Sequence, residues 1–368
     1  MVSDNYKLFK KIIADEKKVE TVYKPSEYWR EYSLRITKSI LKSGLSDFRS
    51  NAQILTGFGD VLVENPLDKF SGDSFKERIL LKILNNNLFK KYFLSQYINF
   101  AKSKNEHVLI YRNLYCEKIL TKWFDKFSKK HHLPSTLVGK PSDYILYNKK
   151  KVGISYLVAF SRINCLEKII NFKKIGSVFE IGGGFGALSH SILHFYPNIK
   201  KLFYLDLSPN IYIGTQYLKF FFKKSVYDYL STRNNKKIEV NENKREIFPI
   251  CPWQIKQVDS KIDLFFNFAS FQEMDEKIVY NYLSKLKNIL NKPNSFLCIG
   301  LYRTKMRNRI RRSRILQICE EIFQTRPFKI IPLILDVSPL YFGDIVAKAA
   351  KCAPAECPVI KIRSGLPP

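Results

Sequence analysis

The feature that most constrains the fold of this chain is a glycine-rich turn between an apolar strand and a helix. Residues 177–188 read SVFEIGGGFGAL, and the apolar start of this run predicts a buried strand. Gly182, Gly184 and Gly186 permit backbone conformations and close contacts that a Cβ atom would prevent. A second apolar run then ends in Asp206, 20 residues after Gly186. Nucleotide-binding βαβ units place an acid at about this distance to bind ribose hydroxyls, so the pattern predicts a nucleotide site.

Different nucleotides would suit the turn to different degrees. A P-loop needs Gly-Lys-Ser/Thr to hold phosphate and magnesium, whereas Gly186 is followed by Ala187 and Leu188. A dinucleotide would place its pyrophosphate at the helix N-terminus, where the Glu180 carboxylate would repel it. A nucleoside cofactor that carries positive charge suits Glu180 better. A strand–helix turn that binds no ligand is the remaining alternative.

The pattern of elements predicts an α/β fold. From residue 177 apolar strands alternate with helices, which is typical of a mostly parallel sheet with helices on both faces. We expect a mainly helical N-terminal region over residues 1–150, which would bind substrate, act as a lid or mediate oligomerisation. The α/β domain is expected over 151–348 and a loosely ordered tail over 349–368. The strands are expected at residues 177–182, 201–207, 261–268, 295–302, 328–335 and 341–348.

The helices are predicted from apolar spacing and from capping residues. Ser208 is expected to be an N-cap, with Pro209 as the first helical residue. The helix over residues 305–323 is very basic, which fits either phosphate binding or a solvated surface. The other helices are expected at residues 7–18, 26–42, 76–101, 113–130, 185–196 and 275–290.

Composition points to anionic partners and to a reducing compartment. The 368 residues carry a net charge of +29, from 62 Lys and Arg against 33 Asp and Glu. Such an excess favours phosphorylated glycolipids, nucleotide-sugars, an acidic membrane surface or nucleic acid, although biased base composition explains part of it. The seven cysteines form no C-x-x-C pair, which indicates reduced thiols in the cytoplasm. No uncharged apolar run approaches the ~18 residues of a membrane span, so contact with a membrane, such as its inner face, would be peripheral.

A second group of polar residues follows the predicted strand that begins near Asp263. Residues 263–274 read DLFFNFASFQEM, so Asn267 falls near the carboxyl end of this strand and Ser270, Gln272 and Glu273 follow it. In open α/β sheets, ligands bind outside the carboxyl ends of the strands. We therefore expect Asn267 to contact the cofactor or the acceptor, and Ser270 and Gln272 to orient the substrate.

Together, the motifs EIGGGFG at residues 180–186, YLDLS at 204–208 and DLFFNFASFQEM at 263–274 resemble those of a bacterial family classed as sugar O-methyltransferases. In that family the first motif reads like E-I-G-x-G-x-G, the second strand ends in D-L-P, and the fourth strand carries N-x-x-S-F-x-E-M. This chain has Ser208 where proline is usual. The resemblance covers roughly residues 25–348.

The resemblance implies S-adenosyl-L-methionine as the cofactor and a Rossmann-like fold. The turn at Gly182, Gly184 and Gly186 would pass close to the amino-acid part of the cofactor, and Asp206 would bind its ribose. The acceptor would be a sugar or glycan of a surface polysaccharide or its precursor, free, phosphorylated or linked to a nucleotide.

Transfer to a sugar hydroxyl requires help in removing the proton, because a hydroxyl group is a weak acid. We expect Glu273 to be the general base; the alternative is that it caps or salt-bridges the next helix. Arg303, directly after a predicted strand, is expected to bind an anionic group of the substrate. No metal site is predicted, because His190 and His194 lie one turn apart without the glutamate that zinc hydrolases place between them.

Two further function classes compete. An RNA or DNA methyltransferase would suit the positive charge, but amino-methylating enzymes of that kind carry [D/N]-P-P-[Y/F], whereas residues 267–270 read NFAS. We therefore do not expect nucleic acid as the partner. The third class is a methyltransferase fold that has lost activity and serves as a binding protein. The sequence does not indicate an oligomeric state.

Overall fold

The computed structural model describes residues 1–55 and 121–335, apart from positions 143, 242, 269, 291–294, 303–311 and 324–328. Its core is a six-stranded sheet in the order β5-β4-β3-β6-β7-β8, in which every neighbouring pair is parallel. The strands are β3 Ser177–Ile181, β4 Lys201–Leu205, β5 Glu246–Ile250, β6 Leu264–Phe268, β7 Phe296–Tyr302 and β8 Lys329–Leu335.

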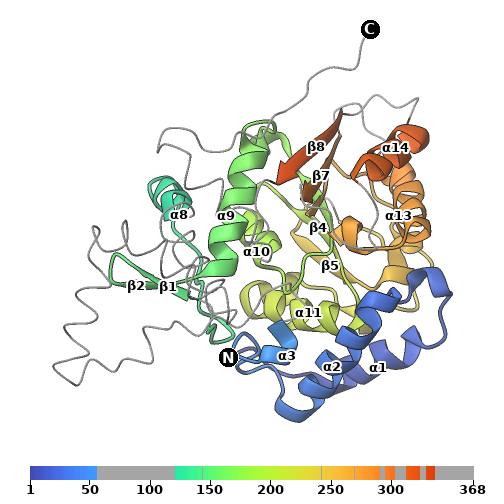
Figure 1. Cartoon of the computed structure of the whole chain (residues 1–368), viewed down its shortest axis with the longest axis horizontal. Coiled ribbons are helices and arrows are strands. Elements are labelled where there is room, and N and C mark those ends of the chain that lie inside the picture. The colour runs from blue at the N-terminus through green and yellow to red at the C-terminus, as the bar shows by residue number, and fades with distance from the viewer. Residues whose placement is uncertain are drawn as a thin grey trace, which may run out of the picture.

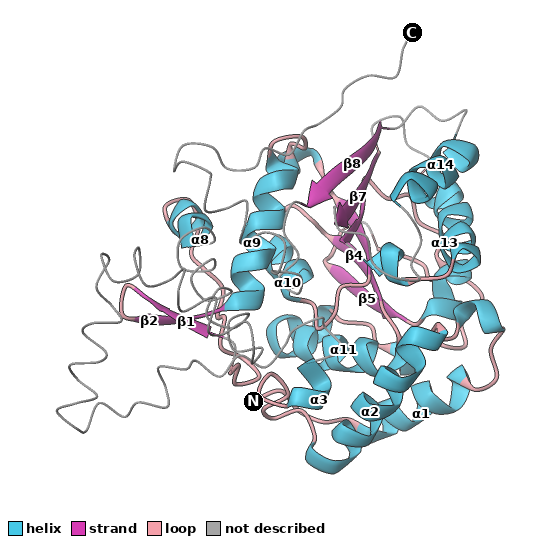
Figure 2. Cartoon of the chain, viewed as in Figure 1, coloured by secondary structure: helices cyan, strands magenta, loops and turns pink. Residues whose placement is uncertain are grey.

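Helices cover both faces of this sheet. From β3 the chain runs through β4 to β5 at one edge of the sheet, and from β6 it runs through β7 to β8 at the other. Because crossovers between parallel strands are right-handed, these opposite directions place the connecting helices on opposite faces. In agreement, α9 and α10 lie on one side of the strands and α13 and α14 on the other (Figure 2). The helices of this part are α9 Ile154–Glu167, α10 Ala187–Phe195, α11 Ser208–Phe222, α12 Tyr229–Thr232, α13 Glu276–Ile289 and α14 Arg312–Phe323. Short 3-10 turns are η5 Phe172–Lys174, η6 Lys223–Ser225, η7 Pro252–Gln257 and η8 Ser270–Glu273.

The described part of the N-terminal region is mainly helical; α1 and α2 pack on α11, and α8 packs on α9 (Figure 1). The Asn5 amide donates to the Tyr212 hydroxyl at 2.9 Å, and Arg233 pairs with Asp15 at 3.2 Å. These contacts join the first helix to the α/β part of the chain. The elements are α1 Tyr6–Glu16, η1 Thr21–Tyr23, α2 Glu27–Ser43, α3 Ala52–Leu55 and α8 Thr121–Ser128, followed by a hairpin of β1 Tyr144–Tyr147 and β2 Lys150–Gly153. Among the described residues, no helix is long and apolar enough to cross a lipid bilayer.

The predicted α/β fold is confirmed, and five of the predicted strands lie within one or a few residues of β3, β4, β6, β7 and β8. The sixth prediction, at residues 341–348, lies outside the described residues, as do the tail over 349–368 and the helix over 76–101. Three larger features were missed: the helix α9, the edge strand β5 and the hairpin β1–β2. The second strand of the hairpin includes residue 150, where the N-terminal region was expected to end.

The predicted role of Ser208 as an N-cap is wrong. Ser208 is the first residue of α11, and Leu207 occupies the cap position with an extended backbone. The Ser208 hydroxyl instead donates to the Glu16 carboxylate of α1 at 2.5 Å. This hydroxyl, which could cap its own helix, therefore joins α1 to α11.

Candidate cofactor and substrate site

The glycine-rich turn leaves β3 with three residues in the left-handed region. The φ angles of Gly182, Gly184 and Gly186 are +77°, +62° and +93°, which strain any residue with a side chain. Gly186 is the N-cap of α10, so the turn leads directly into the helix N-terminus. The structure thus confirms the conformational reason for glycine at these three positions.

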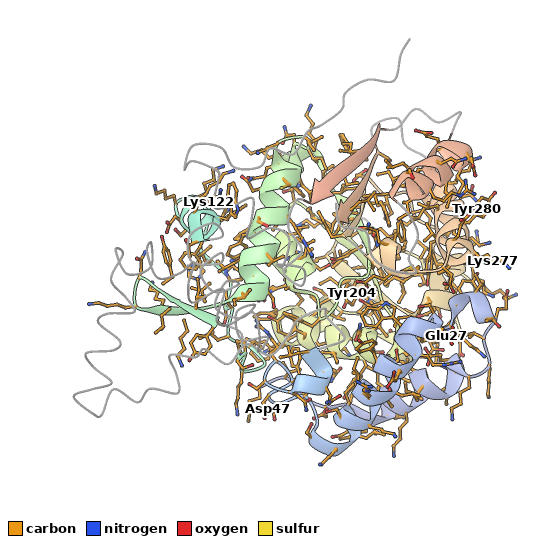
Figure 3. All side chains as sticks on the ribbon, viewed as in Figure 1. Glu27, Asp47, Lys122, Tyr204, Lys277 and Tyr280 are labelled. Carbon is orange, nitrogen blue, oxygen red and sulfur yellow. The ribbon has the colours of Figure 1, made fainter. Side chains whose placement is uncertain are left out.

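The fourth glycine of the turn is required by space rather than by its backbone angle. A Cβ on Gly183 would overlap the Tyr204 ring and lie 2.7 Å from the Glu180 carboxyl carbon. Tyr204 also donates a hydrogen bond to the carbonyl of Gly184, and its ring fills the space left by Gly214 of α11. Figure 3 labels Tyr204 in the interior of the molecule, where this contact fixes the path of the turn.

Asp206 lies directly after β4, beside the turn, as the sequence spacing predicts. One oxygen accepts the Gly184 amide at 2.8 Å, and the other accepts the Leu207 amide at 2.7 Å and the Asn210 side chain at 3.2 Å. A carboxylate has about four acceptor positions, so these three bonds from described residues leave one on the oxygen that faces Gly184. Burial raises the pKa of Asp206 to about 6, against the lowering effect of these hydrogen bonds.

Glu180 lies beneath the turn, on the strand next to that of Asp206. Its side chain is buried and accepts a hydrogen bond from the hydroxyl of Ser189 in α10. Burial raises the pKa of Glu180 to about 7; the Ser189 bond and the Arg162 charge lower it, and the negative charge of Asp206 raises it further. Two interacting carboxylates therefore flank the turn, and both are costly to ionise without a nearby cation.

Asn267 and Ser270 join the carboxyl ends of β3 and β6. The Asn267 amide group donates to the Ile181 carbonyl at 2.8 Å and to the Ser270 hydroxyl, while its oxygen accepts the Phe271 amide at 3.2 Å. Ser270 packs directly on Gly182, where a Cβ would overlap its side chain. Both residues hold the two strands together at the edge where the sheet order reverses. A contact of Asn267 with cofactor or of Ser270 with substrate stays a prediction.

The other predicted substrate residues follow β6 or lie outside the described part. Gln272 is buried in η8, and Glu273 is partly exposed at the end of this turn. Glu273 therefore lies near the carboxyl end of β6, where an acceptor would meet the turn. Arg303 lies outside the described residues.

His190 and His194 have structural contacts. His190 stacks on Phe221 with 3.7 Å between ring centres, and its Nδ1 bonds to the hydroxyl of Tyr156. Burial lowers the pKa of His190 to about 3. Nε2 of His194 contacts the carbonyl of His132 at 2.6 Å. Across the described residues, no three His, Cys, Asp or Glu side chains form a group that could hold a metal ion.

Sequence reasoning missed the residues that support the turn from neighbouring elements. These are Tyr204, Ser189 and Asn210, which bond to Gly184, Glu180 and Asp206 respectively. The sequence signal for Asn210 is its place four residues after Asp206, at the start of a helix. Tyr204 gave no such signal, because its contact with the turn requires the pairing of β3 with β4.

Together, the fold and the turn define a Rossmann-like α/β protein with a nucleotide-type glycine turn. No protein-family model matches the chain, and no curated protein matches it. Among solved structures, the mitomycin 7-O-methyltransferase MmcR matches with a TM-score of 0.28 and 14% identity, and the match covers 48% of each chain. An O-methyltransferase family protein from Burkholderia thailandensis matches with a TM-score of 0.25 and 11% identity over 77% of each chain. The DszA carbon methyltransferase matches with a TM-score of 0.28 and 12% identity, over 89% of this chain and 81% of its own.

Proposed function

We propose that this chain is an S-adenosylmethionine-dependent O-methyltransferase of the cytoplasm that acts on a sugar hydroxyl of a bacterial surface polysaccharide, glycolipid or precursor. The observation that carries the proposal is the pair of buried acids, Glu180 and Asp206, beside the glycine turn on neighbouring strands. A positively charged ligand lowers the cost of ionising these acids, whereas a pyrophosphate raises it. A sulfonium nucleoside therefore fits the site better than an anionic one.

The residues of the turn fit the two ends of this cofactor. Asp206 keeps one acceptor position beside Gly184 for a ribose hydroxyl. Gly184 has no side chain and is partly exposed, so a ligand can contact its backbone. S-adenosylmethionine would supply a methyl group that is activated by its positively charged sulfur.

Glu273 is the proposed general base for the acceptor hydroxyl. It follows β6, whose carboxyl end lies next to that of β3 and its turn. The carboxylate would accept the hydroxyl proton as the oxygen attacks the methyl carbon, and its partial exposure leaves it accessible to an acceptor from solvent.

The strand order gives a second candidate. Counted along the chain, the six strands run 3-2-1-4-5-6, which is the order of doubly wound dinucleotide-binding sheets. A nicotinamide or flavin dinucleotide would also use an acid after the second strand for its ribose. Glu180 argues against it, because the pyrophosphate would lie at the turn beside a buried carboxylate.

The test is methyl transfer from radiolabelled S-adenosylmethionine to a panel of sugars, nucleotide-sugars, lipopolysaccharide and RNA. We expect label in a sugar-containing acceptor. Glu273→Gln should lower turnover about 100-fold or more while S-adenosylhomocysteine still binds, because general bases contribute at least that much. Glu276→Gln, an exposed change three residues away, is the matched control and should keep full turnover. Label in RNA alone would contradict the substrate class, and full turnover of Glu273→Gln would contradict the base.

A further inference from the structure

Arg162 lies on the largely buried helix α9, and its guanidinium group is directed at the sheet. Its helix, α9, has the sequence ISYLVAFSRINCLE and buries eight of its residues. The Arg162 guanidinium carbon lies 5.0 Å from the centre of the Phe268 ring. Phe268 is the last residue of β6, so the Arg162 charge lies beside the carboxyl edge of the sheet.

Strand register places Arg162 on the same sheet face as Glu180. Phe266 pairs with Glu180 across the two strands, and Phe268 is two residues further along β6. Side chains two residues apart on a strand share a face, and the Phe266 and Phe268 rings lie 5.8 Å apart. In agreement, the Arg162 charge opposes the rise in the Glu180 pKa that burial causes.

Within the described part of the chain, the N–H groups of Arg162 donate no hydrogen bond. Its guanidinium contacts the Phe268 ring and interacts electrostatically with Glu180. Other arginines differ: Arg49 donates to the Thr136 carbonyl at 2.7 Å, and Arg314 pairs with Glu276 at 2.7 Å. Arg162 is partly exposed, so a ligand can reach it. Its guanidinium lies over the Phe268 ring and carries a planar set of donors suited to carboxylate or phosphate.

We propose that Arg162 binds a carboxylate or phosphate group of a ligand at the carboxyl edge of the sheet. This inference rests on the proposed function, whose ligands supply two such groups. One is the carboxylate of the methionine part of the cofactor, and the other is a phosphate on a nucleotide-linked or phosphorylated acceptor. In both cases Arg162 orients a ligand next to Glu180 and the end of β6.

The experiment compares the wild-type chain with Arg162→Met by titration calorimetry. The probes are S-adenosylhomocysteine, methylthioadenosine (the same nucleoside without the amino acid) and inorganic pyrophosphate. Lys168→Met is the matched control, since it removes one charge from the exposed end of the same region. Arg162→Gln, which stays polar, replaces the methionine variant if that variant unfolds.

We expect Arg162→Met to weaken the binding of one probe that carries a carboxylate or a phosphate group about tenfold or more, as the loss of a charged hydrogen bond implies. Weaker S-adenosylhomocysteine with unchanged methylthioadenosine identifies the cofactor carboxylate, and weaker pyrophosphate alone identifies an acceptor phosphate. Unchanged binding of all probes, or equal weakening of S-adenosylhomocysteine and methylthioadenosine, would overturn the proposal. If the wild-type chain binds no S-adenosylhomocysteine, the proposed function fails, while the pyrophosphate titration still tests Arg162.

Discussion

Replacing Glu180 by glutamine should change how the stability of the protein depends on pH. Burial raises the pKa of Glu180 from 4.5 to about 7, so the folded chain binds a proton that the unfolded chain releases between these values. Stability should therefore fall as pH rises through this window, since the folded state binds more protons there. A shift of this size corresponds to about 3 kcal/mol, at about 1.4 kcal/mol for each pKa unit.

Glutamine removes this titration but keeps an oxygen that can accept the hydrogen bond from Ser189. Asp206 has a raised pKa too and should account for the pH dependence that remains. The assay is urea unfolding of the ligand-free protein at about pH 5 and about pH 8, with the free energy extrapolated to water. We expect Glu180→Gln to reduce the fall in stability between the two pH values by about 3 kcal/mol.

The matched control is Glu276→Gln. The hydrogen bond from Arg314 lowers the pKa of this exposed carboxyl, so it titrates below the tested range and its removal should leave the fall unchanged. If Glu180→Gln shows the same fall as the wild-type chain, Glu180 does not have the raised pKa from which the proposed cation site is argued.

Three further predictions concern the turn and its ligand. Gly182→Ala should destabilise the protein by about 1–3 kcal/mol and abolish binding of S-adenosylhomocysteine, because alanine is strained at positive φ and overlaps Ser270. The control is Gly176→Ala, whose Cβ would lie 3.5 Å from its nearest neighbour. In unfolding and binding assays, this control should change neither stability nor affinity. Tyr204→Phe should cost about 1 kcal/mol in thermal unfolding by removing the hydrogen bond to the turn, and an unchanged melting temperature would contradict that contact. Affinity for S-adenosylmethionine, measured by calorimetry, should rise between about pH 6 and about pH 8, because a cation favours ionised Glu180 and Asp206. Affinity that falls over this range would contradict attraction of the cofactor by these two acids.

Local patterns predicted most of the sheet, because its inner strands are short apolar runs. Strand β5 was missed because it begins with Glu246 and contains Pro249, which argues against a strand when position in the sheet is unknown. The structure explains how both Glu246 and Pro249 fit in a strand. β5 is an edge strand, where proline is tolerated, and Glu246 is buried beside Lys201 at 3.6 Å.

The hairpin β1–β2 was missed because its turn lacks glycine. Asn148 and Lys149 form the two-residue turn with φ values of +47° and +62°. Asn-Gly is the strong sequence signal for such a turn, and lysine at the second position conceals it.

In the candidate site, too, residues close together in the sequence were predicted, and contacts between distant segments were missed. Spacing along the chain predicted the glycines and Asp206, since a strand, a turn and the next strand are close in sequence. The contacts of Ser270 with Gly182 and of Arg162 with Phe268 join segments that are 88 and 106 residues apart, and they depend on which strands are neighbours. Arg303, which was expected to bind an anionic group, lies outside the described residues, so its role stays a prediction beside the proposal for Arg162.

Cofactor binding at the glycine turn is tested by comparing two cofactors. Titration calorimetry would compare S-adenosylmethionine with NAD⁺ on the wild-type chain and on Asp206→Ala. The account predicts that S-adenosylmethionine binds the wild-type chain, that NAD⁺ does not, and that Asp206→Ala weakens the binding at least about tenfold through loss of the ribose contact. Binding of NAD⁺ without S-adenosylmethionine, or of neither ligand, would contradict it.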